Sequence, residues 1–183
     1  VFVDEAQDIS LNEYRLLQLI NENATFNLFG DTEQNVTPYR GVGNWTDVFP
    51  QYTLYTLNQN YRNTNQIVRF VAEQLGVDMQ PIGFDGPEVS HLPSRKLSGF
   101  FKDKKGLKTI ICSEANKEKY MRKSYNDPSA KGKVSRSKIN VMTVYESKGL
   151  EFTSVAVDPD GMSTSEAYIA YTRALKELAV IKK

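Results

Sequence analysis

The chain has little of the residue types that build redox, metal and membrane sites. It carries one cysteine, Cys112, and one histidine, His91, among 183 residues. These counts exclude an internal disulfide framework and a His-rich metal site. No apolar run approaches the ~20 residues that a membrane-spanning helix needs, and no basic-then-apolar signal pattern opens the chain. We therefore expect a cytoplasmic protein without a membrane partner.

Charge is unevenly distributed, although the net charge is only +1. Residues 1–94 hold 4 Lys/Arg against 12 Asp/Glu, whereas residues 95–138 hold 14 against 4. A basic segment of this kind is typical of a surface that meets phosphates, but a solvated lysine-rich loop has the same composition. Eight of its cations would form a helix edge and a mobile loop that meet phosphates, or else remain exposed without a partner. They are Lys117, Lys119, Arg122 and Lys123 for the edge, and Lys131, Lys133, Arg136 and Lys138 for the loop.

Strand and helix patterns alternate along the chain, which predicts an α/β fold with a mainly parallel sheet. Residues 76–105 look irregular, residues 126–138 look loop-like, and a domain boundary near residue 51 divides the chain into 1–50 and 51–183. Because the first three residues already resemble a buried strand, we expect a piece of a longer protein. The expected strands are 1–3, 26–29, 52–57, 107–112, 139–144, 153–157 and 178–181. One expected helix begins at Leu11, a second ends at Leu75, and two more cover 114–123 and 165–175.

Parallel sheets bind ligands at the carboxyl ends of their strands, and four segments carry polar residues that we expect at such ends. In VFVDEAQD, residues 1–8, an apolar strand is followed by Asp4 and Glu5, which suit a Mg²⁺ ion and an attacking water. In FNLFGDTEQ, residues 26–34, the strand is followed by Gln34, a residue type that orients water near a γ-phosphate. Taken singly, either segment is equally compatible with a structural or capping role.

The other two segments supply cations and hydroxyls. LNQNYR, residues 57–62, puts Arg62 before a helix, where it can pair with a phosphate or with a surface carboxylate. VMTVYESKGLEF, residues 141–152, offers hydroxyls and a cation to a nucleic-acid backbone. We group this stretch with EAYIAYTRALKEL, residues 166–178, as the fourth segment. The lone arginine of that stretch, Arg173, would ordinarily be a surface residue or form a salt bridge.

Together these segments resemble the superfamily 1 DNA helicases of the UvrD/Rep type. Their order matches motif II (DEAQD), motif III (GDTEQ through YRG), motif IV (LNQNYR), motif V (TVYESKGLEF) and motif VI (AYIAYTRA). The resemblance covers essentially the whole chain. The roughly 75 residues between motifs IV and V leave no room for the large inserted accessory domain of UvrD, so the chain looks closer to the helicase IV-like group.

The resemblance implies a fold, cofactors and a partner. The fold is a RecA-like parallel sheet flanked by helices, with residues 1–50 the tail of a first RecA-like domain and residues 51–183 the second. The cofactors are ATP and Mg²⁺, bound between the two domains in the family. The partner is single-stranded DNA or a DNA junction, along which ATP hydrolysis would drive movement, most often 3′ to 5′.

The resemblance also implies roles for residues of motifs II and III. Asp4 is similar to the carboxylate that holds Mg²⁺, and Glu5 to the general base that activates water. Gln34 resembles the γ-phosphate sensor, with Gln7 and Asp8 beside it in the nucleotide site. We therefore expect the early part of the chain to carry the hydrolytic chemistry.

The later motifs would supply positive charge and grip DNA. Arg62 and Arg173 resemble paired arginine fingers, which stabilise charge on the transferred phosphoryl group. Glu151 resembles the glutamate that contacts the nucleotide ribose. The residues that match DNA contacts, by stacking or by pairing with phosphates, are Tyr39, Arg40, Thr143, Ser147 and Lys148.

Three departures from the family pattern accompany the resemblance. Tyr145 stands where the family usually has His, and Thr37 replaces a common aromatic. No Gly-x-x-x-x-Gly-Lys-Ser/Thr phosphate-binding loop occurs among the 183 residues, so we expect this segment alone to bind ATP poorly and to be inactive. Alternative functions are a partner-binding remodelling factor, for example on RNA polymerase or with repair proteins, or a truncated nucleic-acid-binding module without ATPase.

Overall fold

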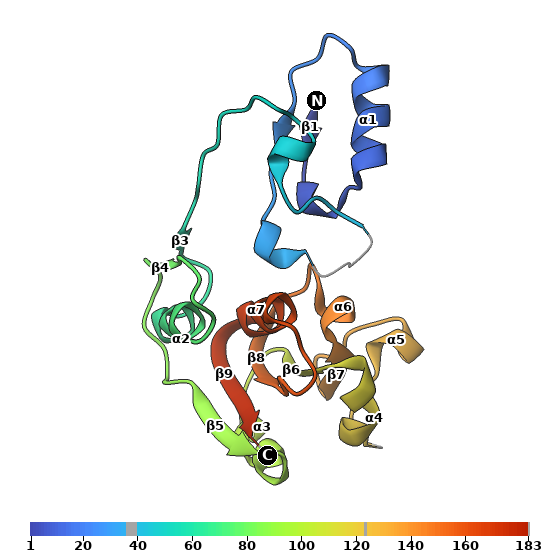
Figure 1. Ribbon diagram of the computed structural model, residues 1–183. Helices are drawn as coiled ribbons and strands as arrows, with labels where there is room; N and C mark the ends of the chain where they lie inside the picture. The colour runs from blue at the N-terminus through green and yellow to red at the C-terminus, as the bar shows by residue number, and fades with distance from the viewer. Residues whose placement is uncertain (36–39, 123, 183) are drawn as a thin grey trace. The chain divides into compact units, whose positions relative to one another are not determined.

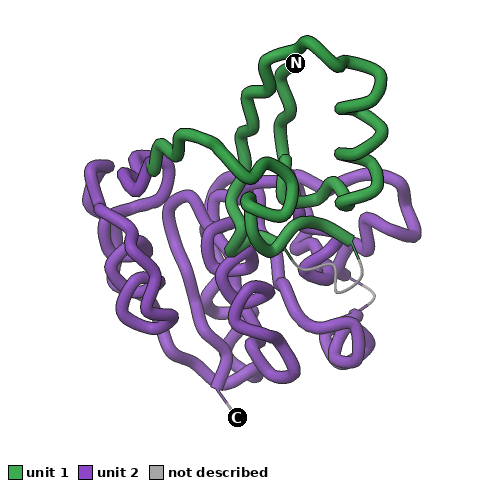
Figure 2. Tube along the Cα trace, turned by 45° about the horizontal axis from the view of Figure 1, so that its top comes forward, with its two compact units in different colours: residues 1–56 green, residues 57–183 purple. Residues whose placement is uncertain are grey.

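Two compact units make up the chain, drawn in green and purple in Figure 2. Unit 1 is Val1–Thr56 and unit 2 is Leu57–Lys183. The computed structural model describes residues 1–35, 40–122 and 124–182. No helix within these ranges is long and apolar enough to cross a membrane. The assignment of the two parts to motor domains stays a prediction.

Unit 1 is a short parallel strand pair beside one helix. Its elements are β1 (Phe2–Val3), η1 (Ala6–Asp8), α1 (Leu11–Ile20), β2 (Asn27–Leu28), η2 (Thr32–Gln34) and η3 (Trp45–Asp47). A capping box starts α1: the Ser10 hydroxyl accepts from the Glu13 N–H, and the Glu13 carboxylate accepts from the Ser10 N–H. Tyr14 is buried against Val3 and Val48, and its hydroxyl donates to the Ala6 carbonyl at 2.7 Å. This bond ties α1 to the turn that follows β1.

Unit 2 is built on a five-stranded sheet in which every neighbouring pair is parallel (Figure 1). The strand order is β5-β9-β8-β6-β7, so the expectation of an α/β fold with a parallel sheet is confirmed. A separate parallel pair lies earlier in the unit. The strands are β3 (Gln59–Asn60), β4 (Gln80–Pro81), β5 (Ser90–Pro93), β6 (Lys108–Cys112), β7 (Ile139–Thr143), β8 (Phe152–Val157) and β9 (Ala174–Lys182).

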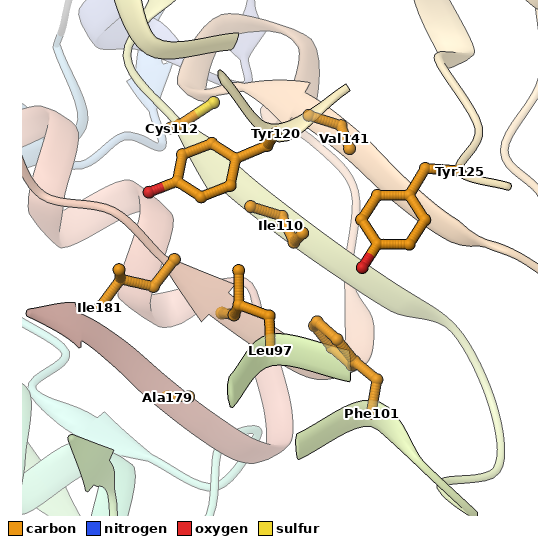
Figure 3. Close-up of a cluster of buried hydrophobic side chains, with 10 residues drawn as sticks. Leu97, Phe101, Ile110, Cys112, Tyr120, Tyr125, Val141, Ala179 and Ile181 are labelled. Carbon is orange, nitrogen blue, oxygen red and sulfur yellow. The ribbon is translucent and has the colours of Figure 1, made fainter. Parts of the chain in front are cut away.

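Helices cover this sheet on both faces because its strands carry apolar side chains in both directions. On one face, Leu97 and Phe101 pack on the cluster that includes Cys112 and Ile110, shown in Figure 3. On the other, two helices pack against each other and against β9. These two are α2 (Asn65–Leu75) and α7 (Thr164–Thr172), and the remaining helices are η4 (Ser94–Lys96), α3 (Leu97–Phe101), η5 (Glu114–Asn116), α4 (Lys117–Tyr120), α5 (Pro128–Lys131) and α6 (Val144–Ser147).

Two expectations from the sequence are wrong around the linking segments. Residues 52–57 form no strand, because no neighbouring strand pairs with their alternating pattern; Tyr55 is 84% exposed and Leu57 95%. Residues 76–105 are not irregular throughout, since they contain β4, β5 and α3. A strand that pairs on one side only tolerates proline, which is how Pro93 fits into β5, the edge strand next to β9.

Three further boundaries differ from the sequence expectation. The helix expected at 114–123 ends at Tyr120, because Met121 adopts extended backbone angles. The segment 126–138 contains the short helix α5. The helix expected at 165–175 ends at Thr172, and β9 begins two residues later, well before the expected start of the last strand.

Candidate functional site

Unit 1 joins three of the predicted motif residues through hydrogen bonds. The Gln7 Nε2 donates to Glu5 Oε2 at 2.7 Å, and Gln7 Oε1 accepts from the Asp31 N–H at 3.1 Å. Asp31 in turn accepts from the Gln34 Nε2 at 2.9 Å. The amide of Gln7 thereby orients Glu5 on one side and is connected to Gln34 on the other. Sequence reasoning noticed the Gly-Asp pair but gave Asp31 no role.

Gln7 is fixed in this network by glycines on two sides. It is fully buried, and a Cβ at Gly30 would lie 2.5 Å from its Oε1. Gly41 has φ +104°, and a Cβ there would lie 2.3 Å from the Gln7 carbonyl oxygen. That carbonyl accepts from the N–H of Val42 at 3.1 Å. Larger residues at either glycine would push Gln7 out of reach of its partners.

The two adjacent carboxylates after β1 are exposed. Glu5 has a left-handed backbone, φ 49°, an uncommon conformation for a residue with a side chain, and its N–H donates to Asp4 Oδ1 at 2.9 Å. Asp8 is half-buried at the end of η1. Within the described ranges no three His, Cys, Asp or Glu side chains gather as a metal site. Mg²⁺ is commonly held by one or two carboxylates plus substrate phosphates, so the exposed carboxylate of Asp4 fits this ion.

The DNA-contact candidates of unit 1 are only partly described. Tyr39 lies outside the described residues. Arg40 Nη2 lies 2.9 Å from Glu13 Oε1, with both side chains well exposed. An exposed pair of this kind contributes little to stability, so Arg40 can exchange Glu13 for another anion at small cost.

In unit 2 the two predicted arginine fingers line one open cavity of about 170 Å³. Arg62 Nη1 forms an ion pair with Glu151 Oε1 at 2.9 Å, and both side chains are partly exposed. Arg173 is 6% exposed, and its Nε and Nη1 donate to the carbonyls of Ile169 and Leu150 at 3.2 and 3.3 Å. Three predicted residues from three motifs are thus brought together.

Asn63 holds the two arginine segments together, a role that sequence reasoning missed. It is 2% exposed, and its Nδ2 donates to the carbonyls of Thr172 and Ala174, on either side of Arg173, at 2.8 and 2.7 Å. Asn60 accepts from the N–H groups of Arg62 and Asn63, both at 3.0 Å. The repeated asparagines of LNQNYRN were the available signal, because buried amides need partners.

The expectation that all four polar segments lie at carboxyl ends of strands is wrong for two residues of unit 2, although Arg62 follows the carboxyl end of β3. Glu151 directly precedes β8, and Arg173 directly precedes β9, so both lie at amino ends. Thr143 is the last residue of β7 and lies at a carboxyl end. Motif V therefore starts at the carboxyl end of β7, whereas Arg173 lies at the amino end of β9. The reason is that α7, which ends at Thr172, returns the chain to the amino ends of the strands.

The motif V residues form a tight helical turn, α6. The Thr143 hydroxyl accepts from the Glu146 N–H, and the Glu146 carboxylate accepts from the Thr143 N–H at 2.8 Å. Ser147 is fully buried and donates its hydroxyl to the Val144 carbonyl at 2.7 Å. Lys148 is half-buried directly after this turn. Contact of these residues with DNA stays a prediction.

Lys117 does not line a DNA-facing edge, contrary to the sequence expectation. It is buried, and its Nζ lies 2.7 Å from Glu146 Oε1, 3.1 Å from Asp127 Oδ1 and 2.9 Å from Ser129 Oγ. Burial by itself would lower the pKa of Lys117, but the bonds from Glu146 and Asp127 raise it overall. The helix that was expected to carry this edge ends at Tyr120, before Arg122. Lys119, which lies within the helix, forms an ion pair with the buried Asp158 at 3.2 Å.

Comparison with known proteins relates part of the chain to Rep helicases. No family model matches. The chain is 32% identical over 75 residues to the ATP-dependent DNA helicases Rep of Escherichia coli and Salmonella typhimurium, and 30% over 76 residues to that of Buchnera aphidicola. Each match covers 38% of this chain, and the chain spans only 11–12% of the length of these relatives.

Solved helicase structures share the fold. The C-terminal domain of a possible DNA helicase from Lactobacillus plantarum matches 66% of this chain and 86% of its own length, with TM-score 0.50 and 20% identity. The arterivirus nonstructural protein 10 helicase with DNA matches 99% of this chain and 39% of its own length, with TM-score 0.60 and 19% identity. The α/β fold with a parallel sheet is therefore that of helicase domains, and the partial match to Rep supports a helicase family.

Proposed function

We propose that this chain is part of an ATP-dependent DNA helicase or translocase of the UvrD/Rep type, which couples ATP hydrolysis to 3′-to-5′ movement on single-stranded DNA. The observation that carries the proposal is the cavity that Arg62 and Arg173 share, with Glu151 paired to Arg62. Two arginines from distant motifs that line one cavity suit the phosphates of a nucleotide. The partial sequence match to Rep helicases supports the same function.

Unit 1 would supply the metal and water chemistry. Asp4 would hold Mg²⁺, which neutralises charge on the nucleotide phosphates when bound. The Glu5 carboxylate would take a proton from the attacking water, and the bond from Gln7 Nε2 fixes the direction in which that carboxylate faces. Gln34 would relay the state of the γ-phosphate through Asp31 and the buried amide of Gln7.

Unit 2 would supply positive charge. Arg173 is bonded to backbone carbonyls and Asn63 grips the peptides beside it, so the guanidinium is held in place before a phosphoryl group arrives. Arg62 is the more exposed of the two arginines and is paired with Glu151. On nucleotide binding, Arg62 would pair with a phosphate instead, and Glu151 would contact the ribose. Preorganised charge of this kind lowers the barrier without reorganisation during reaction.

The 183 residues contain no phosphate-binding loop, so we propose that hydrolysis depends on a part of the protein outside them. The whole protein would belong to the helicase IV-like group, act in DNA repair, and bind single-stranded DNA or DNA junctions. Tyr39, Arg40 and Lys148 would contact the strand, whereas Thr143 and Ser147, both buried, would hold the α6 turn that precedes Lys148.

The test is DNA-stimulated ATPase of the full-length protein carrying Arg173→Ala. Removal of an arginine finger costs about 10³–10⁵ in turnover, while binding to single-stranded DNA should persist. Lys176→Ala, an exposed residue in β9, is the matched control and should keep wild-type turnover. Wild-type turnover in Arg173→Ala would refute the role, and a strand-displacement assay distinguishes unwinding from remodelling of a protein partner.

A further inference from the structure

We propose that residues 122–138, here called the basic loop, form a second contact with the phosphodiester backbone of single-stranded DNA, tied to α6 by Lys117. The inference rests on the proposed function and adds to it a surface that none of the helicase-like motifs contains. The loop lies between α4 and β7, and the helix inside it, α5, packs on β7.

The charge of the basic loop is almost entirely of one sign. Its sequence has six Lys/Arg and a single acidic residue, Asp127. The Asp127 carboxylate is paired with Lys117 Nζ at 3.1 Å and accepts from the Ser129 hydroxyl at 2.6 Å, so its charge is directed at a cation outside the loop. The exposed cations among the described residues of the loop are Arg122, Lys131, Lys133, Arg136 and Lys138.

Residues 126–138 of the basic loop are folded, because two buried asparagines hold their backbone. Asn126 Nδ2 donates to the Lys133 carbonyl at 3.0 Å and to Asn140 Oδ1 at 2.9 Å. Asn140, in β7, accepts from the Ser135 N–H at 2.8 Å and donates to the Ser135 carbonyl at 3.0 Å. Cations fixed in this way lose less conformational freedom on binding a phosphate backbone than cations on a flexible chain.

The buried cluster around Lys117 joins the basic loop to motif V. The ammonium group contacts Asp127 of the loop and Glu146 of α6, and Glu146 also accepts from the N–H of Thr143. A displacement of α6 therefore acts on the loop through one shared cation.

The surface favours nucleic acid over a lipid membrane. Cations alone attract anionic lipids, but firm peripheral membrane binding adds exposed apolar side chains that enter the lipid. No exposed large hydrophobic residue lies in the described part of the basic loop, where Tyr125 is 9% exposed and buried in the core cluster of Figure 3. Cations without apolar neighbours suit a phosphodiester backbone, which is bound mainly by electrostatics.

The experiment measures the salt dependence of binding to fluorescein-labelled oligothymidine by the full-length protein. A single strand contributes about 0.7 to the slope of log K against log salt for each phosphate neutralised, so losing four cations should reduce the slope by up to about 3. The loop variant carries Lys131→Gln, Lys133→Gln, Arg136→Gln and Lys138→Gln. The control, with the same change of charge on exposed lysines elsewhere in unit 2, carries Lys96→Gln, Lys102→Gln, Lys105→Gln and Lys176→Gln.

The inference holds if the loop variant lowers the slope and the control does not. Equal effects of both variants, an unchanged slope in the loop variant, or no binding by the wild type overturn it. Binding to phosphatidylserine vesicles that depends on the loop, without loop-dependent binding to oligothymidine, also overturns it. Hydrogen exchange of the wild type is an independent readout, in which DNA should protect residues 122–138. DNA-stimulated ATPase activity tests the proposed function separately. If the protein binds DNA through the loop but does not hydrolyse ATP, the loop inference holds and the proposed function fails.

Discussion

Lys117→Met tests the buried ion cluster that joins α4, α5 and α6. Methionine keeps most of the side-chain stem and its packing but removes the charge. Glu146 and Asp127 would then lose the cation that lies 2.7 and 3.1 Å from their oxygens. We expect unit 2 to become less stable, because two partly buried carboxylates are left without compensation.

The expected cost is about 2–3 kcal/mol. Removing one partner of a fully buried ion pair costs about 3–5 kcal/mol. Here Glu146 and Asp127 keep 26% and 21% side-chain exposure, so water recovers part of that loss. Adding Glu146→Gln to Lys117→Met should cost less than the sum of the two single changes, because the neutral amide no longer needs the cation.

The dependence on pH has a definite sign. Burial would raise the pKa of Glu146, but the bonds from Lys117 and from the Thr143 N–H lower it below its ordinary 4.5. A lowered carboxyl pKa gives stability that is present above pH 4.5 and is lost as the pH falls through the folded value. The difference between wild type and Lys117→Met should therefore be largest near neutral pH and should shrink as the pH falls and these carboxyl groups become protonated in both proteins.

Urea denaturation followed by far-ultraviolet circular dichroism measures these differences on the whole chain. Lys131→Met is the control, because Lys131 is exposed and a surface change of this kind typically stays within about 0.5 kcal/mol. A loss below about 1 kcal/mol for Lys117→Met would show that the cluster is solvated. A loss that stays unchanged at low pH would show that packing, rather than charge, explains the effect.

Two further predictions concern a glycine and the cysteine. Gly41→Ala combines a strained φ of +104° with a Cβ 2.3 Å from the Gln7 carbonyl oxygen, so unit 1 should lose about 2 kcal/mol or more. The fluorescence of Trp45, the one tryptophan in the chain, reports that transition, and a wild-type midpoint would contradict the argument. Burial raises the pKa of Cys112 to about 12, so a thiol reagent at pH 8 should modify it only after unfolding; rapid modification of the native chain would refute its place in the core.

Much of unit 2 was predictable because its strands are buried. The segments that became β6, β7 and β8 are rich in apolar and β-branched residues, as burial on both faces of a parallel sheet favours. The start of α1 is also a local matter, since the hydroxyl of Ser10, three residues before Glu13, forms a capping box from bonds between near neighbours. These elements depend on chemistry contained within a few neighbouring residues.

Other elements depended on partners distant in sequence. The alternation at 52–57 is a valid strand pattern, but a strand needs a neighbour, and none pairs with it. The opposite error occurred at β5, where prolines and glycines concealed a short strand that β9 stabilises from one side. Pairing is decided by the whole fold, which a local pattern does not contain.

The candidate site divides in the same way. By itself, the order and spacing of the residues was enough to select Glu5, Gln34, Arg62 and Arg173 as candidate site residues. Only the tertiary structure decided that Asn63 grips the peptides beside Arg173, and that Lys117 is an interior cation rather than one facing DNA. The physical reason is that burial and hydrogen-bond partners depend on distances between segments up to 111 residues apart, which the order of residues alone does not specify.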